Sequence, residues 1–233
     1  MSSSGFIERP NSETRGVLFD WRGTLVHDPP FEWWVRAAFS RARRPTDDDE
    51  IRRLCEQLGR AAHLPEILDA ERTADCSLEQ HRAWSMLYFS RAGLDNELAL
   101  SLYDVDFDPA SHPFYPDVPA ALHQLYDRGV RIAIVSDIHF DLRPEFASAG
   151  LEQSIDAFVL SFEHGVQKPD PAIFQIALEA LDIEPDQAMM VGDRASHDGG
   201  AVALGIATLL LPKLTDLVPR GLDRVLALIA AAT

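Results

Sequence analysis

Cysteine is scarce in this chain. Two cysteines, Cys55 and Cys76, occur among 233 residues. Two are few for a disulfide framework of the kind that stabilises small secreted domains. The first residues also lack the basic start and apolar stretch of a secretion signal. We therefore expect a protein of the reducing cytoplasm.

Long apolar runs are missing as well. The longest, from Ala201 to Leu211, is interrupted by Gly205 and followed by Pro212. A membrane-spanning helix needs about 20 consecutive apolar residues, and this run is much shorter. We interpret it as the end of a helix followed by a buried strand, and we expect no membrane partner.

Positive charge is in short supply. Lys and Arg together number 21 against 37 Asp and Glu, which gives a formal net charge of -16 at pH 7. Such a field repels the phosphate backbone of nucleic acids and anionic lipid, so we expect no nucleic acid partner. An anionic substrate would need a local group of cations. Whether the protein is a monomer or a homodimer stays open.

The residues that are present suit a globular α/β protein. Hydrophobic residues make up 46% of the chain and charged residues 25%, which is enough apolar material for a packed core. The chain exceeds the usual domain of about 100 to 150 residues but is too short for two, which indicates one core with an insertion. Residues 1-15 are polar and have no apolar period, so we expect a disordered tail there.

Short apolar runs that end in a polar residue recur along the chain. Each has the length of a parallel strand that is buried on both faces. Helical patterns separate them, such as Val118, Ala121, Leu122 and Leu125 with a period near 3.6. This alternation predicts a doubly wound, Rossmann-like parallel sheet. The predicted strands are Gly16 to Asp20, Val130 to Ser136, Ala157 to Ser161, Ala188 to Asp193 and Ala207 to Leu211.

The alternation stops between the first two strands, where every pattern is helical. Within this stretch Ser77 and Gln80 form the capping-box signal of a helix start, ahead of the apolar residue Trp84. We predict an all-helical cap domain over residues 27-113. It would be inserted into a core formed by residues 16-26 and 114-233.

Several polar residues occur where the predicted strands end. Parallel strands place their carboxyl ends at one edge of a sheet, where ligands bind. Asp20 there can attack a phosphorus atom, and Asp193 can ligate a hard cation. Ser136 and Lys168, which follow the second and third strands, can hold phosphate oxygens. Such carboxylates are also common helix N-caps, so it is the combination that favours phosphoryl transfer.

Together these residues resemble the four signatures of the haloacid dehalogenase-like superfamily, in the order that this family uses. The resemblance spans Gly16 to about Leu211. The signatures in this chain are Phe19-Asp20-Trp21-Arg22-Gly23-Thr24-Leu25, Ser136, Lys168-Pro169-Asp170-Pro171 with Phe174, and Gly192-Asp193 followed by Asp198.

The resemblance implies a hydrolase that acts on a small phosphorylated metabolite. Asp20 would form an aspartyl-phosphate, while Ser136 and Lys168 would bind the phosphoryl oxygens. The helical insertion resembles the family's mobile cap, which closes over small substrates. Several cap residues are candidates to line the substrate pocket. Aromatic residues of a helix more often belong to a hydrophobic core than to a pocket, so no role is assigned to these candidates. They are Trp33, Trp34, His63, Arg72, Trp84 and Tyr88.

The resemblance also implies a magnesium site. Mg2+ would be held by Asp20, Asp193 and the backbone carbonyl of Arg22. Asp198 would be a carboxylate behind these ligands. Asp198 is equally expected to cap the helix that runs toward Leu204, and the two roles are compatible.

One residue departs from the family's pattern. Its phosphatases carry a second aspartate two residues after the nucleophile, as general acid and base, and this chain has Arg22 there. A guanidinium keeps its proton at any accessible pH, so it can neutralise charge on a phosphate but cannot transfer a proton. Loss of general acid-base catalysis costs about 100- to 10,000-fold in rate.

Three interpretations follow from this departure. The first is an enzyme that still forms the Asp20 adduct, with His139 or His197 as the proton donor or with a leaving group that needs no proton. The second is a haloacid dehalogenase, although the fourth signature is of the metal-binding type. The third is a non-catalytic binding or regulatory protein in which Arg22 pairs with Asp20 or Asp193. The retained aspartate, lysine and metal-site pattern favour the enzyme.

Overall fold

The structure is a computed structural model that describes residues 13–231. Residues 1-12 of the predicted tail lie outside this range. Arg15, near the end of the predicted tail, donates its backbone N–H to the carbonyl of Gln187 at 2.8 Å. Its own carbonyl accepts the N–H of Arg131 at 2.9 Å, so it continues the pairing of the sheet by one residue.

Five parallel strands form one sheet in the order β3-β2-β1-β4-β5. Each strand lies within one residue of its predicted bounds, and the predicted doubly wound parallel sheet is confirmed. The strands are β1 (Gly16–Phe19), β2 (Arg131–Ser136), β3 (Ala157–Leu160), β4 (Ala188–Gly192) and β5 (Ala207–Leu210).

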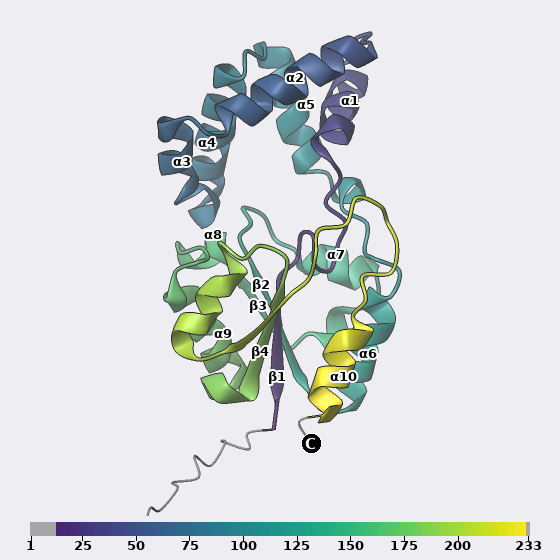
Figure 1. Ribbon diagram of the computed structural model, residues 1–233, viewed down its shortest axis with the longest axis vertical. Coiled ribbons are helices and arrows are strands. Elements are labelled where there is room, and N and C mark those ends of the chain that lie inside the picture. Colours follow the sequence, from purple (N-terminus) through teal and green to yellow (C-terminus); the bar gives the residue numbers. More distant parts are fainter. Residues whose placement is uncertain (1–12, 232–233) are drawn as a thin grey trace, which may run out of the picture.

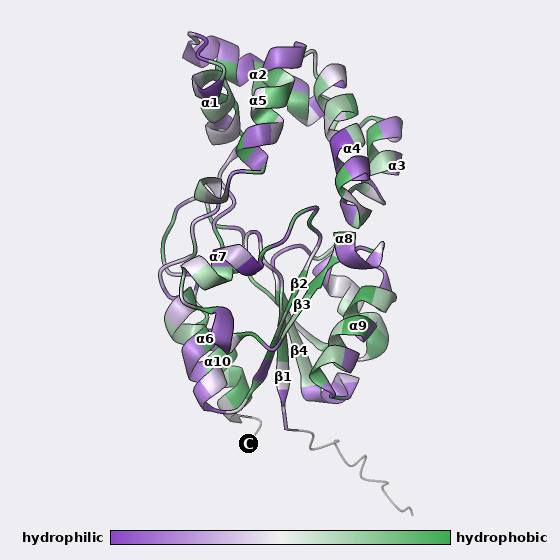
Figure 2. Cartoon of the chain, turned by 180° about the vertical axis from the view of Figure 1, so that it is seen from behind, coloured by the Kyte–Doolittle hydropathy of each residue, from purple (hydrophilic) through white to green (hydrophobic). Residues whose placement is uncertain are grey.

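Helices cover both faces of the sheet (Figure 1). Successive side chains of a strand point to opposite faces, so β1 contributes to two hydrophobic clusters. Val17 and Phe19 pack with α6 (Val118–Asp127), α7 (Arg143–Ser148) and α10 (Asp223–Ala231). Leu18 packs on the other face with α9 (Pro171–Leu181). Hydrophobic residues follow the strands in Figure 2, as expected for a sheet covered on both sides.

The helices between β1 and α6 form a separate group above the carboxyl ends of the strands (Figure 1). They enclose a hydrophobic cluster of their own, around Phe39, Ile51 and Leu58. The predicted inserted all-helical cap is therefore confirmed. Its helices are α1 (Phe31–Arg41), α2 (Asp48–Ala61), α3 (Pro65–Glu71), α4 (Leu78–Arg91) and α5 (Asn96–Asp106).

The cap meets the core through two segments that run side by side. The backbone N–H of His27 donates to the carbonyl of Pro113 at 2.9 Å. Val26 and Phe114 form an antiparallel bridge next to them. These contacts lie at the limits predicted for the cap, residues 27-113, which stay a prediction.

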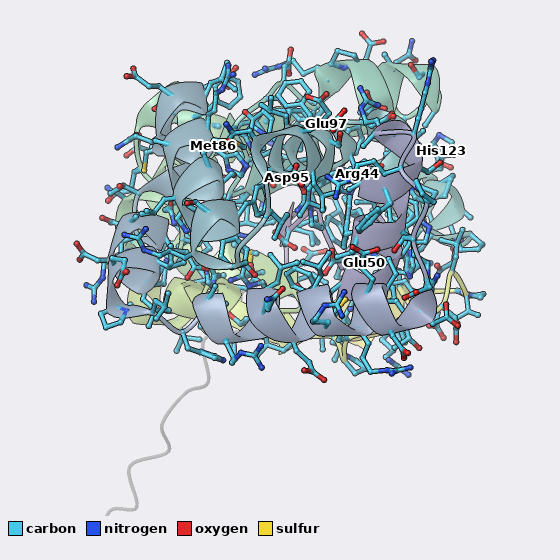
Figure 3. The ribbon with its side chains drawn as sticks, turned by 90° about the horizontal axis from the view of Figure 1, so that it is seen from above. Arg44, Glu50, Met86, Asp95, Glu97 and His123 are labelled. Atoms are coloured by element: carbon cyan, nitrogen blue, oxygen red, sulfur yellow. The ribbon has the colours of Figure 1, made fainter. Side chains whose placement is uncertain are left out.

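Local signals explain where the cap helices begin. The hydroxyl of Ser77 accepts the backbone N–H of Gln80 at 3.1 Å, so the predicted capping interaction starts α4. Asp95 caps α5 in the same way, by accepting the N–H of Leu98 at 3.0 Å. Figure 3 views the cap from above and shows Arg44 beside Asp95, with which it forms an ion pair.

The remaining helices are short. They are α8 (Ser161–His164) and the 3-10 helices η1 (Ala74–Cys76), η2 (Pro109–Ser111), η3 (Glu152–Ser154), η4 (Pro185–Gln187) and η5 (Asp198–Leu204). Among residues 13–231, none of the helices combines the length and the apolar character that a membrane span requires.

One expectation about the sheet is wrong. The run from Ala201 to Leu211 does contain a helix end and a strand, but β5 is not buried, because Ala207 and Leu210 at its ends are exposed. The strand order explains this exposure. β5 lies at the edge of the sheet, where one side of the strand has no neighbour.

Candidate active site

Asp20 follows β1 directly and is held in one orientation. Its backbone N–H donates to the carbonyl of Val191 at 2.9 Å, which places it at the carboxyl edge between β1 and β4. The hydroxyl of Thr24 donates to Asp20 Oδ2 at 3.1 Å, and Lys168 Nζ donates to Oδ1 at 2.6 Å. Burial raises the pKa of Asp20, and the ammonium of Lys168 opposes that shift. The Asp20 carboxylate is therefore fixed in position, and the ammonium of Lys168 offsets its charge.

Lys168 lies between two carboxylates. Its side chain is 2% exposed, and Nζ lies 2.6 Å from Asp20 Oδ1 and 2.7 Å from Asp198 Oδ1. Burial alone would lower the pKa of Lys168, but the two carboxylates raise it above its ordinary value. The side chain therefore carries a positive charge in a protein whose net charge is strongly negative.

Asp198 also binds and orients the ammonium of Lys168. Its Oδ1 accepts Lys168 Nζ, and its Oδ2 accepts the backbone N–H groups of Asp193 at 3.0 Å and Arg194 at 2.9 Å. A Cβ at Gly192 would come within 2.2 Å of the Asp198 carboxyl carbon, so glycine is required there. The prediction of a helix cap is wrong. The residue at the N-cap of η5 is His197, and the carboxylate of Asp198 turns back toward the loop after β4.

Asp193 has the features of a cation ligand. Its buried Oδ1 has no hydrogen-bond partner among the described residues. Burial, with the nearby carboxylates of Asp20 and Asp198, raises the pKa of Asp193 to about 6. One carboxylate oxygen from each of these three residues lies within 4.8 Å of the other two. Hard divalent cations take such oxygen ligands, so the residues present fit one.

The loop after β1 approaches Asp193 closely. Gly23 has a φ of +76°, and a Cβ there would lie 2.5 Å from Asp193 Oδ2. Only a glycine allows both this backbone conformation and this distance. The residues of the first and fourth signatures are thus brought into contact at one point.

A cavity of about 490 Å³ lies over this edge, between cap and core. The residues predicted for the site that line this cavity are Asp20, Arg22, Ser136, Lys168, Asp193, His139 and His197. The cap candidates Trp34, Trp84 and Tyr88 also line it, whereas Trp33, His63 and Arg72 are not among its lining residues. Of the core residues predicted for the site, Asp198 alone is not among the lining residues, and it contacts Lys168 from behind.

Arg22 points toward the cap. Its Nη1 lies 2.8 Å from Asp106 Oδ1, and its guanidinium lies 5.9 Å from the ring centres of Trp21 and Trp34. The non-catalytic interpretation requires an ion pair from Arg22 to Asp20 or Asp193. Within residues 13–231, no such ion pair is present. Arg22 pairs with Asp106 instead, and Asp20 pairs with Lys168.

The geometry of this edge matches a known family. The family model of the haloacid dehalogenase-like hydrolases covers residues 14–205. The chain belongs to this family of hydrolases. It is 30% identical over 208 residues to the ribulose-1,5-bisphosphate 5-phosphatase of Halopiger xanaduensis, a match that covers 83% of each chain.

Other relatives match over shorter segments. The hydrolase is 36% identical over 88 residues to the phosphoserine phosphatase of Thermus thermophilus, which is 37% of this chain and 35% of that protein. The match thus spans about a third of the length of that phosphatase.

Solved structures share the fold. A phosphatase of the family from Thermococcus onnurineus has a TM-score of 0.60 at 23% identity, over 92% of this chain and 97% of the other. The L-2-haloacid dehalogenase of Xanthobacter autotrophicus with covalently bound chloropropionic acid has a TM-score of 0.62 at 21% identity, over 86% and 78%. The fold is therefore common to phosphatases and dehalogenases.

Several residues of the site were missed by the sequence analysis. Thr24 lies inside the first signature, four residues after Asp20, and its hydroxyl could have been predicted to contact that carboxylate. Asp137 follows Ser136 at the end of β2, so the strand-end rule also applied to it. No sequence signal indicated the cap residues Asp75 and His81. The ring of His81 stacks on that of His139 at 3.4 Å, and His81 Nδ1 lies 2.8 Å from Asp75 Oδ1.

Proposed function

We propose that this hydrolase is a magnesium-dependent phosphatase that acts on a small phosphorylated metabolite, with Asp20 as its covalent nucleophile. One observation carries the proposal: Lys168 Nζ lies 2.6 Å from Asp20 and 2.7 Å from Asp198. This places a fixed positive charge where a phosphoryl oxygen would approach the nucleophile. The names of the phosphoserine and ribulose-bisphosphate phosphatase relatives agree with a phosphorylated substrate.

The carboxylates of Asp20 and Asp193 and the backbone carbonyl of Arg22 would hold Mg2+. The free Oδ1 of Asp193 supports this choice, and both oxygens of Asp198 are already bound by protein donors. Once bound, Mg2+ would supply positive charge against the phosphoryl oxygens and the clustered carboxylates.

Each of the remaining residues of the site has a separate role in the proposed reaction. A carboxylate oxygen of Asp20 attacks phosphorus, a bond from Asp20 to phosphorus forms, and the bond from phosphorus to the leaving oxygen breaks. Ser136 and Lys168 hold the phosphoryl oxygens, while Thr24 keeps the Asp20 carboxylate in position through its 3.1 Å hydrogen bond. Water then attacks phosphorus, which releases phosphate and restores Asp20.

The cavity supports a small substrate. The cavity has a volume of about 490 Å³, with the proposed phosphoryl site on its core side and cap residues on its opposite wall. Trp34, Trp84 and Tyr88 contribute apolar surface to that wall, so the rest of the substrate would be shielded from water. A haloacid dehalogenase needs no cation ligand, whereas the unpartnered Oδ1 of Asp193 supports one.

The proposal is tested by a screen of phosphorylated metabolites with magnesium, read as phosphate release. Wild-type protein quenched in acid should retain phosphate on Asp20, and Asp20→Asn should retain none, because an amide is not a usable nucleophile. Absence of phosphate release and of magnesium binding would favour the non-catalytic interpretation. Halide release from 2-haloacids would favour the dehalogenase.

A further inference from the structure

Most of the carboxylates that line the cavity are held by a basic side chain within 4.0 Å. These pairs are Asp20 with Lys168, Asp28 with Lys213, Glu71 with Arg194, Asp75 with His81, and Asp106 with Arg22. Asp137 and Asp193 line the cavity too, and neither has an ion-pair partner in the part of the chain that the structure describes. Asp193 is the proposed cation ligand. Asp137 is thus the lining carboxylate without an assigned role.

Asp137 is fixed beside the phosphoryl site. It follows Ser136 at the end of β2, and its Oδ1 accepts the backbone N–H of Lys168 at 2.7 Å. The side chain of that same lysine binds Asp20. Among residues 13–231, hydrogen bonds reach only one of the two Asp137 oxygens. The other oxygen is free to meet a group in the cavity.

We infer that Asp137 is the general acid and base of this hydrolase and replaces the aspartate that the family carries at the position of Arg22. The inference rests on the proposed phosphatase function. When the bond from phosphorus to the leaving oxygen breaks, the proton of Asp137 moves to that oxygen. The resulting carboxylate then takes a proton from the water that attacks phosphorus. One water is consumed, and alcohol and phosphate are released.

The charge environment of Asp137 suits both roles. Burial raises its pKa to about 7, an effect that Asp75 and Asp20 increase and Lys168 opposes. The pKa of the nearby Cys76 thiol is raised by burial and by carboxylates that include Asp137. Near neutral pH the carboxyl group of Asp137 is therefore present in both forms, as an acid that later acts as a base requires.

The two histidines predicted as alternatives are worse placed. His139 lines the cavity, but its side chain is 1% exposed, stacks on His81 and has its Nδ1 3.7 Å from Asp75 Oδ1, so it is engaged with cap residues. Burial lowers the pKa of His197 to about 4, so its ring is neutral and a weak acid at neutral pH. Neither matches the free, half-buried carboxyl group of Asp137.

The test compares Asp137→Asn with wild type on phosphates of different leaving groups. For alkyl phosphates, kcat/KM should fall about 100-fold or more, because the departing alkoxide needs a proton. For aryl phosphates with acidic phenols the loss should be much smaller. The limb of the wild-type pH profile near pH 7 should also disappear. Asn keeps an acceptor for the Lys168 N–H, so the fold should survive, which the unfolding midpoint verifies.

Asp141→Asn is the matched control. Asp141 lies in the same loop, is exposed, and accepts the backbone N–H of Arg143 at 3.0 Å away from the cavity, so its variant should behave as wild type. An equal loss on alkyl and aryl phosphates, or an unchanged rate on both, would overturn the role of Asp137. Wild-type protein that forms no phosphoenzyme at all would instead overturn the proposed function, and the inference with it.

Discussion

Arg22 and Asp106 form an ion pair at 2.8 Å that joins the loop after β1 to the last residue of α5. The two side chains are 32% and 22% exposed, so the pair is partly shielded from water. Burial alone would raise the pKa of Asp106, but the charge of Arg22, together with nearby histidines, outweighs burial and lowers it. At the position where the family's phosphatases carry their acid, this hydrolase thus carries a link between core and cap.

A double-mutant cycle should detect that link. We expect Arg22→Ala and Asp106→Ala to couple by about 1 kcal/mol in the free energy of unfolding, above the usual value for a fully exposed pair. Urea titrations of the two single variants and the double variant provide the measurement. The exposed pair of Arg52 and Asp49 serves as the control. Coupling no larger than that of the control would mean that Arg22 does not hold the cap.

Replacement of Lys168 by Met should destabilise the protein and weaken phosphate binding. It would leave Asp20 and Asp198 buried together without their shared cation, which costs about 3 kcal/mol or more in the free energy of unfolding. Urea unfolding and phosphate titration measure the two effects. Lys213→Met is the matched control, since Lys213 is 63% exposed and pairs with Asp28 at the surface. Similar losses in both variants would contradict a special role for Lys168.

Replacement of Asp193 by Asn should weaken magnesium binding at least about tenfold, because loss of a carboxylate ligand also lowers the charge of the site. Titration calorimetry with beryllofluoride as the phosphate analogue measures it. Asp28→Asn removes a cavity carboxylate that already pairs with Lys213, and it should have a smaller effect. Unchanged affinity in Asp193→Asn would place the cation elsewhere.

His112 should make stability depend on pH. Burial, helped by Arg22, lowers its pKa from 6.5 to about 4. Between these values the unfolded chain binds a proton that the folded chain does not. The free energy of unfolding should therefore fall as the pH drops from about 6.5 to 4, by up to about 1.4 kcal/mol per pH unit from this residue.

His112→Phe should remove that contribution and flatten the decline, measured by urea titration at several pH values. Phenylalanine suits the site, because the His112 ring packs 4.9 Å from Trp21 and 5.3 Å from Trp34. The same replacement at the exposed His123 should leave the slope of the wild type. Equal slopes in wild type and His112→Phe would mean that another group causes the pH dependence.

The sheet and most residues of the proposed phosphoryl site could be predicted from the sequence. A parallel strand that is covered on both faces requires a continuous apolar run, so each run identified a strand. Parallel strands also end at one edge, so residues at those ends had to meet. Asp20, Ser136, Lys168 and Asp193 accordingly line one cavity. Asp137 satisfied the same rule at the end of β2.

The pairing of the remaining side chains follows from the tertiary structure alone. The direction of Asp198 depends on the backbone N–H groups of Asp193 and Arg194, which the turn after β4 aims at it. The partner of Arg22 lies 84 positions later, at the end of α5. Pairs between cap and core depend on how two separately packed units approach each other. That approach follows from the shape of both hydrophobic cores together, and no local pattern of residues encodes it.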